Sequence, residues 1–470
     1  MFSLLFLAVA SLLLSIVLTP LVRITSQRLG FLDHPDASRK PDYRPIPRVG
    51  GVAVALSFVL SYTIWSFTPL NGSYTIHQNL PLILKLIPAV ALVFTIGLLD
   101  DLIHLRASLK FLGQIAAATI AYFAGVHVMG FGVASFTQWW WTLPATVFWL
   151  VACTNAINLI DGIDGLAAGL SLVATLSMLL GAALSHNVLL AFATVPLAGC
   201  LIGFLRYNFN PASVYLGDSG SLFIGFLLGC YGVLSSQKSA TLLGMTAPLI
   251  ALSIPLLDTT LAILRRFLRR QPIFTADRGH IHHRLLDRGL TPRTAALLLY
   301  GVGAIAAMFS LAMANNHLEI PVIVVFGVVT WLGIQRLGIA EFDTAGRLML
   351  RGAFRGLLTS HIHLDSLKAR LAKAESTEEC WQILAATYRD LGFCHIRLHL
   401  AGSSFSTGSP DHPYWRVEIP LHGADFIELA HPFDSANHQA GLATLADALR
   451  QTLTARNLAA PLTRSAAAGS

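Results

Sequence analysis

Residues 83–101 read ILKLIPAVALVFTIGLLDD, and this stretch decides the class of fold. A predominantly apolar run of roughly 20 residues is long enough to cross a bilayer as a helix. Similar runs recur to about residue 340, and in the whole chain 54% of residues are hydrophobic and only 12% are charged. Soluble domains carry about 25% charged residues, so this composition excludes an ordinary soluble protein. We expect an all-α polytopic membrane protein.

Eleven apolar windows meet the length criterion for a transmembrane helix. The first window has no basic residues ahead of it and no cleavage site of small residues, so we expect an uncleaved span rather than a signal peptide. The expected spans lie near 1–22, 50–69, 83–100, 111–127, 140–157, 166–184, 187–205, 220–236, 241–263, 294–314 and 318–338.

The loops between these spans alternate in basic content. Arginine and lysine gather in the first, third, seventh and ninth loops, and the even loops hold almost none apart from Lys238. By the positive-inside rule, the odd loops of a polytopic membrane protein lie in the cytoplasm, which places the N-terminus outside. The net charge of +7 then reflects contact with anionic membrane lipids, and we expect no nucleic acid partner.

The composition changes at Glu341, where charged and polar residues reach the density of a globular domain. We expect a membrane domain over 1–340, a small cytoplasmic α+β domain of unknown role over 341–458, and a disordered tail over 459–470. The expected helices of the second domain lie near 350–373, 377–391 and 438–456, and its strands near 395–400, 415–421 and 426–430.

The opening stretch ends with Asp100 and Asp101, and Arg106 and Lys110 follow about one and two helical turns later. Two carboxylates at the end of a span are costly near hydrocarbon unless a cation neutralises them. Mg²⁺ is the cation that suits such oxygen ligands, usually together with substrate phosphates. The pair therefore indicates either a metal–diphosphate site or a solvated helix end.

Residues 155–166, NAINLIDGIDGL, place Asn155, Asn158, Asp161 and Asp164 at three-residue steps. On a helix these side chains form one polar stripe. An amide-lined contact between helices is one interpretation. The two carboxylates favour a second one, a ligand site, because the span itself supplies no partner for them.

Residues 215–226, YLGDSGSLFIGF, place Asp218 where a loop enters the next span. An aspartate there either caps the helix or holds a metal that carries an anion.

The ninth loop combines Arg278, His280, His282 and His283 with many further arginines. Zinc is one reading, but no cysteine or close acidic partner completes a tetrahedron. We favour hydrogen bonds from these side chains to diphosphate oxygens.

The five cysteines of the chain show no ligand spacing and are expected to be packing residues. Contact with anionic lipid is the interpretation for Arg265, Arg266, Arg269 and Arg270.

In this order, the segments resemble the polyprenyl-phosphate N-acetylhexosamine-1-phosphate transferase family over about residues 1–340. Within the family, the HxHH form is similar to the GlcNAc-type branch, because phospho-MurNAc-pentapeptide transferases carry a triple histidine. The motifs that carry the resemblance are Pro47-Arg48-Val49-Gly50-Gly51, the Asp100-Asp101 pair with Lys110, NxxNxxDGxDGL at 155–166, GDSGS at 217–221 and His280-Ile281-His282-His283.

The resemblance implies a transferase that moves an N-acetylhexosamine-1-phosphate, foremost GlcNAc-1-phosphate, from a UDP-sugar to undecaprenyl or another polyprenyl phosphate. UMP is released, and the product begins a cell-envelope polysaccharide such as lipopolysaccharide. The implied cofactor is Mg²⁺, with Mn²⁺ as the alternative. Phospho-MurNAc-pentapeptide transfer is the second reading, and the oligomeric state, a homodimer included, is left open.

The resemblance also implies residue roles. The catalytic group is Asp100, Asp101, Asp161, Asp164, His280, His282 and His283. The substrate-binding group is Arg48, Gly50, Gly51, Lys110, Asn155, Asn158 and Arg278. The metal ligands are Asp218, Asn158 and Asp101. We expect Asp100 to position metal or lipid rather than to act as a base, because a phosphate monoester has a second pKa of about 6 and is already largely dianionic at neutral pH.

Three other classes fit less well. A transporter should carry its carboxylates near mid-membrane and show an inverted repeat, whereas here they gather at one end of the spans. A scaffold leaves the five motifs unexplained. An aspartate-rich polyprenyl transferase lacks the further acidic residues that should follow Asp100 and Asp101.

Overall fold

The computed structural model describes residues 2–33, 45–68, 73–131, 134–135, 138–237, 246–268, 279–312, 319–336, 370–371, 374, 376–388, 393–400, 402–408, 414–421 and 425–432. The chain divides into two compact units, Met1–Glu341 and Phe342–Ser470.

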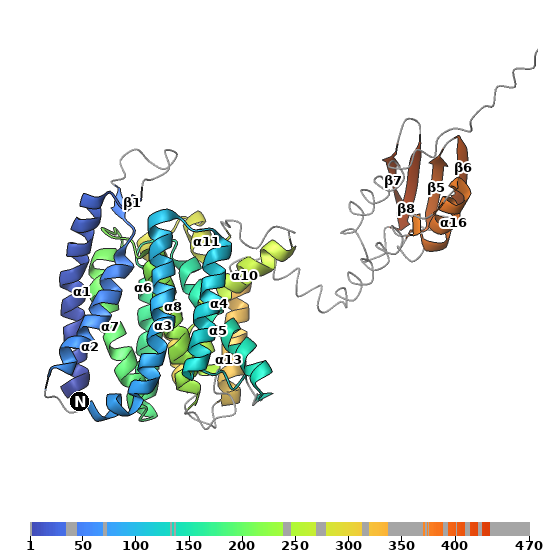
Figure 1. The fold of residues 1–470 in the computed structure, drawn as a ribbon. Helices are drawn as coiled ribbons and strands as arrows, with labels where there is room; N and C mark the ends of the chain where they lie inside the picture. The colour runs from blue at the N-terminus through green and yellow to red at the C-terminus, as the bar shows by residue number, and fades with distance from the viewer. Residues whose placement is uncertain are drawn as a thin grey trace, which may run out of the picture. The chain divides into compact units, whose positions relative to one another are not determined.

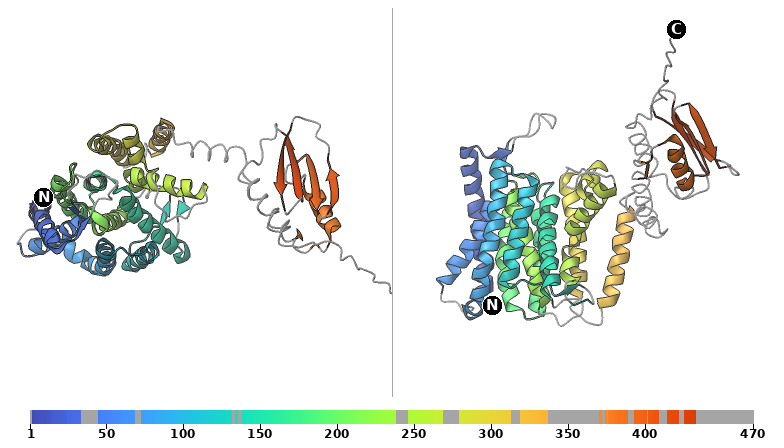
Figure 2. Two further views of the ribbon diagram at one scale, coloured as in Figure 1. Left: turned by 90° about the horizontal axis from the view of Figure 1, so that it is seen from above. Right: turned by 45° about the vertical axis from the view of Figure 1, so that its right-hand side comes forward.

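The first unit is a bundle of helices, most of which stand side by side along one direction (Figures 1 and 2). Its helices are α1 (Phe2–Leu29), α2 (Gly50–Ser66), α3 (Ser73–Ile103), α4 (Ala107–Ala124), α5 (Trp139–Ile160), α6 (Leu166–Leu184), α7 (Val188–Asn208), α8 (Gly217–Gln237), α9 (Thr246–Ala251), α10 (Ser253–Leu268), α11 (Ile281–Asp287), α12 (Pro292–Ala312) and α13 (Glu319–Arg336). Two short antiparallel pairs join β1 (Leu32–Asp33) to β2 (Ile46–Pro47) and β3 (Gly130–Phe131) to β4 (Ala134–Ser135).

Among the described residues, eight helices are long and apolar enough to cross a membrane. They are α1, α4, α5, α6, α7, α8, α12 and the Pro81–Ile103 part of α3, and two shorter apolar helices, Gly50–Ser66 and Ile320–Gly333, accompany them. The prediction of a mostly helical, polytopic membrane protein is therefore supported, whereas the count of eleven spans stays a prediction.

The ninth expected span, 241–263, differs most from the prediction. In its place lie α9 and α10, which are separated at Leu252. Pro255 has no N–H to donate to the carbonyl of Ala251, and its ring crowds that carbonyl, so the helix is interrupted just ahead of it. Helix α10 then lies across the direction of the other helices and leaves the side of the bundle (Figures 1 and 2).

Arg265 and Arg266, near the end of α10, also correct an expectation. Their exposed fractions are only 2% and 6%, so they are buried in the protein and do not face lipid as predicted. Arg265 packs against the backbone of Gly279, just ahead of the HxHH motif. Arg269 and Arg270 lie outside the described residues.

Helix α8 is the centre of the bundle. It packs against α2, α3, α5 and α6, and 83% of its apolar window is buried, compared with 22% for α1. The approach of α2 is very close: the Gly51 N–H donates to the Leu216 carbonyl at 2.8 Å, and a Cβ on Gly51 would overlap the backbone of Gly220. Only a residue without a side chain fits at this contact.

The second unit contains a four-stranded antiparallel sheet with one helix. Helix α16 (Thr377–Thr387) is capped by Ser376, whose hydroxyl accepts from the Glu379 N–H at 3.2 Å. The sheet order is β6-β5-β8-β7, with β5 (His395–Leu400), β6 (Ser403–Thr407), β7 (Tyr414–Pro420) and β8 (Phe426–Pro432).

The sheet confirms the three expected strands and adds β6. Its sequence, SSFST, is rich in serine and therefore reads as a turn. Phe405 is its one large apolar residue, and the Phe405 ring stacks on Trp381 of α16 at 5.5 Å. The helices expected near 350–373 and 438–456 lie mostly or wholly outside the described residues, as does the tail 459–470.

The contact between α2 and α8 can be tested with a matched pair of glycine variants. We expect Gly51→Ala to destabilise the protein by about 1–3 kcal/mol, because the new methyl group has no space beside Gly220. Gly301→Ala is the control, since Gly301 is exposed on α12 and a Cβ there meets nothing within 4 Å. Thermal unfolding in detergent measures both. Equal melting temperatures for the two variants would contradict the tight contact.

Candidate functional site

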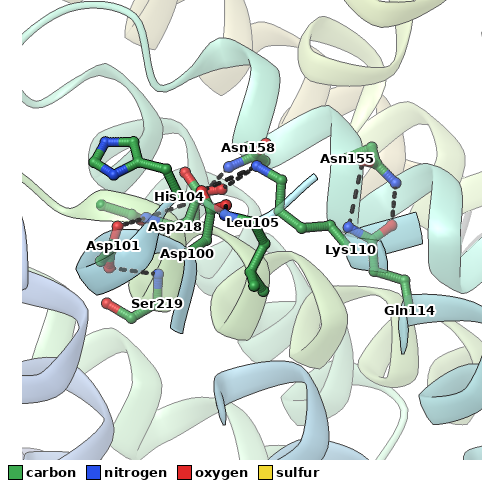
Figure 3. A network of polar contacts seen from close by, with 12 residues as sticks. Asp100, Asp101, His104, Leu105, Lys110, Gln114, Asn155, Asn158, Asp218 and Ser219 are labelled. Atoms are coloured by element: carbon green, nitrogen blue, oxygen red, sulfur yellow. Dashed lines mark hydrogen bonds and ion pairs between the residues drawn. The ribbon is translucent and has the colours of Figure 1, made fainter. Parts of the chain in front are cut away.

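The motifs that are far apart in the sequence meet at one end of the bundle. Successive long helices run in alternating directions, so the ends of α3 and α5 lie beside the starts of α4 and α8. Figure 3 shows the resulting network of polar side chains. Asp100 and Asp101 come from α3, Lys110 from α4, Asn158 from α5 and Asp218 from α8.

Asp101 joins α3 to the first turn of α8. Its Oδ1 accepts from the Asp218 N–H at 2.7 Å, and its Oδ2 accepts from the Ser219 N–H at 2.9 Å. The first N–H groups of a helix have no partner within that helix, so a carboxylate there acts as an N-cap from another element. Both oxygens of Asp101 are therefore engaged in holding α8, while its predicted catalytic and metal-binding roles stay predictions.

Gly217 makes this contact possible. Its φ of +71° lies in the left-handed region, and a Cβ would overlap the Arg48 carbonyl and lie 2.7 Å from an Asp101 carboxylate oxygen. The GDSG part of the motif is thus a turn that brings the start of α8 against α3.

Lys110 bridges two carboxylates at the centre of the network. Its Nζ lies 3.0 Å from Asp100 Oδ2 and 2.9 Å from Asp218 Oδ2 (Figure 3). The other oxygen of Asp100 accepts from the Leu105 N–H at 2.7 Å, so both Asp100 oxygens have donors. The three charged side chains are 10–24% exposed, which leaves them within reach of a ligand from solvent.

The two asparagines of the stripe have different surroundings. Asn158 Nδ2 donates to Ser221 Oγ at 2.9 Å, and within the described part of the chain no donor is recorded for its Oδ1. Asn155 pairs with Gln114 of α4 and donates to the Val151 carbonyl at 2.8 Å. Asn158 thus belongs to the site, whereas the contacts of Asn155 are those of an amide pair between two helices.

Asp161 and Asp164 also differ. Asp164 Oδ2 accepts from Asn210 Nδ2 and from the Ala212 N–H, both at 2.9 Å, so it holds the loop between α7 and α8. Asp161 follows the last residue of α5, and its carboxylate has no recorded hydrogen bond or ion pair with the described residues.

The electrostatic setting of Asp161 is strongly unfavourable for a negative charge. Burial, together with the charges of Asp218, Asp101 and Asp164, raises the pKa of the Asp161 carboxyl to about 8, against the opposing effect of Arg48. The site therefore carries more negative charge than its own cations offset.

The first-loop motif borders this network. Arg48 NH1 lies 3.2 Å from Nε2 of His104, an exposed residue directly after α3. Gly50 and Gly51 are buried, and their N–H groups donate to the carbonyls of Tyr215 and Leu216. The glycines thus pack the loop against the start of α8, and their predicted contact with substrate stays a prediction.

The HxHH motif borders the 161–165 turn. His282 is 1% exposed, and a Cβ on Gly162 would overlap its ring, so the imidazole covers this turn. Burial and the neighbouring His283 lower the pKa of His282 to about 4, so its ring is neutral at neutral pH. The His280 and His282 rings are stacked at 5.6 Å, and Arg278 lies outside the described residues.

Sequence reasoning missed three residues of this region. His104 and Gln114 carried no distinguishing signal, since each is an ordinary polar residue near a helix end or on a helix face. Asp258 of α10 did carry one: a single carboxylate inside the apolar run SIPLLDTTLAIL must have a buried partner. Its partner is His280.

No group of three or more histidine, cysteine, aspartate or glutamate side chains at metal-ligand spacing occurs in the described ranges. The donor set at the site nevertheless suits a hard divalent cation, because it includes the carboxylate of Asp218 and the amide oxygen of Asn158, and a charge on Asp161 would be offset only in part, by Arg48.

The chain is similar in sequence to known proteins. The sequence model of the family described as "Glycosyl transferase family 4" matches residues 83–236. The chain is 34% identical over 330 residues to a Bacillus subtilis protein named "Probable undecaprenyl-phosphate N-acetylglucosaminyl 1-phosphate transferase", an alignment that covers 69% of this chain and 89% of the relative.

Two further relatives come from other bacteria. A Mycobacterium tuberculosis decaprenyl-phosphate N-acetylglucosaminephosphotransferase is 33% identical over 355 residues, which covers 68% of this chain and 87% of the relative. A Listeria monocytogenes phospho-N-acetylmuramoyl-pentapeptide-transferase is 30% identical over 290 residues, which covers 57% and 83%. With near-complete coverage of relatives at this identity, the chain belongs to the polyprenyl-phosphate N-acetylhexosamine-1-phosphate transferase family.

Proposed function

We propose that this membrane transferase moves N-acetylglucosamine-1-phosphate from UDP-N-acetylglucosamine to undecaprenyl phosphate, as the first membrane step of a cell-envelope polysaccharide. The observation that carries the proposal is the Lys110 bridge between Asp100 and Asp218, which gathers charge from three helices at one end of a membrane bundle. The Bacillus and Mycobacterium relatives, named for N-acetylglucosamine transfer, support the choice of sugar.

The proposed reaction joins two anions. An oxygen of the lipid phosphate attacks the β-phosphorus of the nucleotide sugar, a new P–O bond forms, and the bond from that phosphorus to the bridging oxygen breaks. UMP leaves with that oxygen. Because the acceptor phosphate is already dianionic, the site must supply positive charge and in-line geometry rather than a strong base.

The residues at the site can serve these needs. Lys110 is placed to offset phosphate charge, and Arg48 and His104 border the network at 3.2 Å from each other. Asp218 and Asn158 are the side chains that would hold Mg²⁺ or Mn²⁺, and Asp101 stands behind them as the cap of α8. When bound, this cation would neutralise diphosphate charge near the carboxylates.

We infer that the site end of the bundle faces the cytoplasm of a bacterial inner membrane. Arg23, Arg28 and Arg206 lie at the ends of helices that lead to this end. Trp139, Trp140 and Trp141 lie exposed at the start of α5, at the opposite end, where an aromatic belt is typical of the interface. UDP-sugars are made in the cytoplasm, so this orientation brings the site to its donor.

Release of UMP by the purified protein in detergent tests the function. We expect UMP from UDP-N-acetylglucosamine and undecaprenyl phosphate, and none after EDTA treatment. Lys110→Gln should lower kcat/KM by roughly 100- to 1000-fold, because it removes the charge between Asp100 and Asp218. Lys85→Gln is the matched control, since Lys85 is exposed further back on α3.

The alternative outcomes are distinct. Turnover of UDP-MurNAc-pentapeptide instead would make the protein a phospho-MurNAc-pentapeptide transferase. No UMP from any UDP-sugar would overturn the proposed function and reopen a transport role. Equal activities of the two lysine variants would remove the Lys110 bridge from the mechanism.

Asp100→Asn separates positioning from base catalysis. Both Asp100 oxygens already accept hydrogen bonds from Leu105 and Lys110, so we expect a positioning role. The variant should therefore lose rate while its pH–rate profile keeps the shape of the wild type. A changed slope on the acid side of the profile would instead assign Asp100 a proton-transfer role.

The Asp161 carboxyl should make the stability of the protein depend on pH. Its pKa of about 8 in the folded protein exceeds the ordinary value of about 3.9, so the folded state binds this proton more tightly than the unfolded chain. The contribution of this proton to the free energy of unfolding is complete below about pH 4 and is lost as the pH rises through about 8.

We therefore expect the melting temperature in EDTA to fall between about pH 5 and pH 9 more steeply for the wild type than for Asp161→Asn, whose amide cannot ionise. Thermal unfolding across this range measures the difference. Parallel curves for the two proteins would show that Asp161 ionises normally.

A further inference from the structure

Asp258 is a buried carboxylate that the proposed reaction leaves without a role. It lies on α10 with an exposed fraction of 1%. Burying a carboxylate is costly unless hydrogen bonds and a charged or polar partner compensate it. A carboxylate retained at such a position therefore indicates that its contacts are needed.

The contacts of Asp258 are directed to the start of the HxHH motif. Its Oδ2 lies 3.0 Å from Nδ1 of His280, and its Oδ1 accepts from the Ile281 N–H at 2.8 Å. No side chain of α11 caps its own first turn, because His280 makes no such hydrogen bond. Asp258 therefore supplies the cap from α10 and fixes the His280 ring with the same carboxylate.

This geometry selects one form of His280. A carboxylate only accepts hydrogen bonds, so Nδ1 of His280 must carry a proton. In the neutral ring, Nε2 then holds the lone pair, and in the charged ring it is the second donor. A carboxylate behind a histidine commonly orients the ring and sets its basicity in this way.

The hold on His280 extends to the next histidine of the motif. The His282 ring is stacked on His280 and covers Gly162, next to Asp161. His282 Nδ1 is 3.9 Å from Asp258 Oδ2, and neither ring nitrogen of His282 has a hydrogen-bond partner among the described residues. A shift of His280 or of the first turn of α11 would therefore move His282 relative to the 161–165 turn.

We propose that Asp258 is a positioning residue for sugar-1-phosphate transfer, which acts by fixing the Nδ1–H form of His280 and the place of His282 over the 161–165 turn. The inference rests on the proposed function for its kinetic consequence. Its structural part, the form of the His280 ring, can be measured without substrate.

The kinetic test is Asp258→Asn, which is a nearly isosteric change. The asparagine oxygen can still accept from the Ile281 N–H, and its NH₂ group then faces Nδ1 of His280. We expect kcat with UDP-N-acetylglucosamine to fall roughly 10- to 100-fold, and KM for undecaprenyl phosphate to stay within about twofold. Thr259→Val is the control: Thr259 is the buried neighbour on α10, and its hydroxyl has no hydrogen-bond partner in the part of the chain that the structure describes.

A double-mutant cycle separates positioning from general destabilisation. If Asp258 acts through His280, Asp258→Asn should change kcat by less than about twofold in a His280→Ala background. An equal loss in both backgrounds would overturn the proposal, as would full activity of the single variant while the wild type is active.

The second readout is ¹⁵N NMR of the full protein labelled at histidine. We expect the signal assigned by its loss in His280→Ala to show a protonated Nδ1 in the wild type and a changed form in Asp258→Asn, with Thr259→Val unchanged. An unaltered His280 signal in Asp258→Asn would overturn the inference. A wild type that releases no UMP would overturn the proposed function alone, because this spectrum still decides the role of Asp258.

Discussion

The candidate site depends on the carboxylate of Asp101, which accepts from the N–H groups of the second and third residues of α8 at 2.7 and 2.9 Å. This contact fixes the central helix of the bundle against α3, and it brings Asp218 to Lys110 and Asp100. The close approach of Gly51 to Gly220 on another side prevents α8 from sliding. Two segments more than 100 positions apart thereby become one rigid wall of the site.

A second property follows from the charges that this wall carries. Asp100 and Asp218 share one lysine, and Asp161 makes no ion pair with the described residues, so a negative charge on Asp161 would be offset only in part, by Arg48. Such a site is completed by what it binds. For the proposed reaction, this charge balance favours a diphosphate that arrives with a divalent cation over a bare diphosphate, which would add to the repulsion.

The class of fold and the gathering of the motifs at one end of the helices were predictable from sequence for simple reasons. Apolar length is a local property, and the alternation of basic loops places the motifs at the same end of the spans. The break ahead of Pro255 was missed because averaging hydropathy over a window hides a single proline. The burial of Arg265 and Arg266 was missed because the sequence around an arginine near a helix end does not show whether its side chain contacts lipid or protein.

Individual roles were harder to predict, because they depend on partners far along the chain. Asp164 meets the loop at 210–212, and Asp258 meets His280, more than 20 positions away. In the sequence alone these carboxylates look like Asp161, which has no such partner among the described residues. Only the folded arrangement distinguishes an aspartate that accepts from the backbone from one that is left available for a ligand.

The use of Asp101, Asp164 and Asp258 as acceptors for backbone amides changes how loss-of-function data from this family should be interpreted. An aspartate-to-alanine variant at any of these positions leaves an N–H group without its acceptor and loosens a helix or loop that carries another motif. Inactivity of such a variant then shows that the structure around the motifs is disturbed. Chemistry can be assigned only to a residue whose replacement leaves the remaining groups in place.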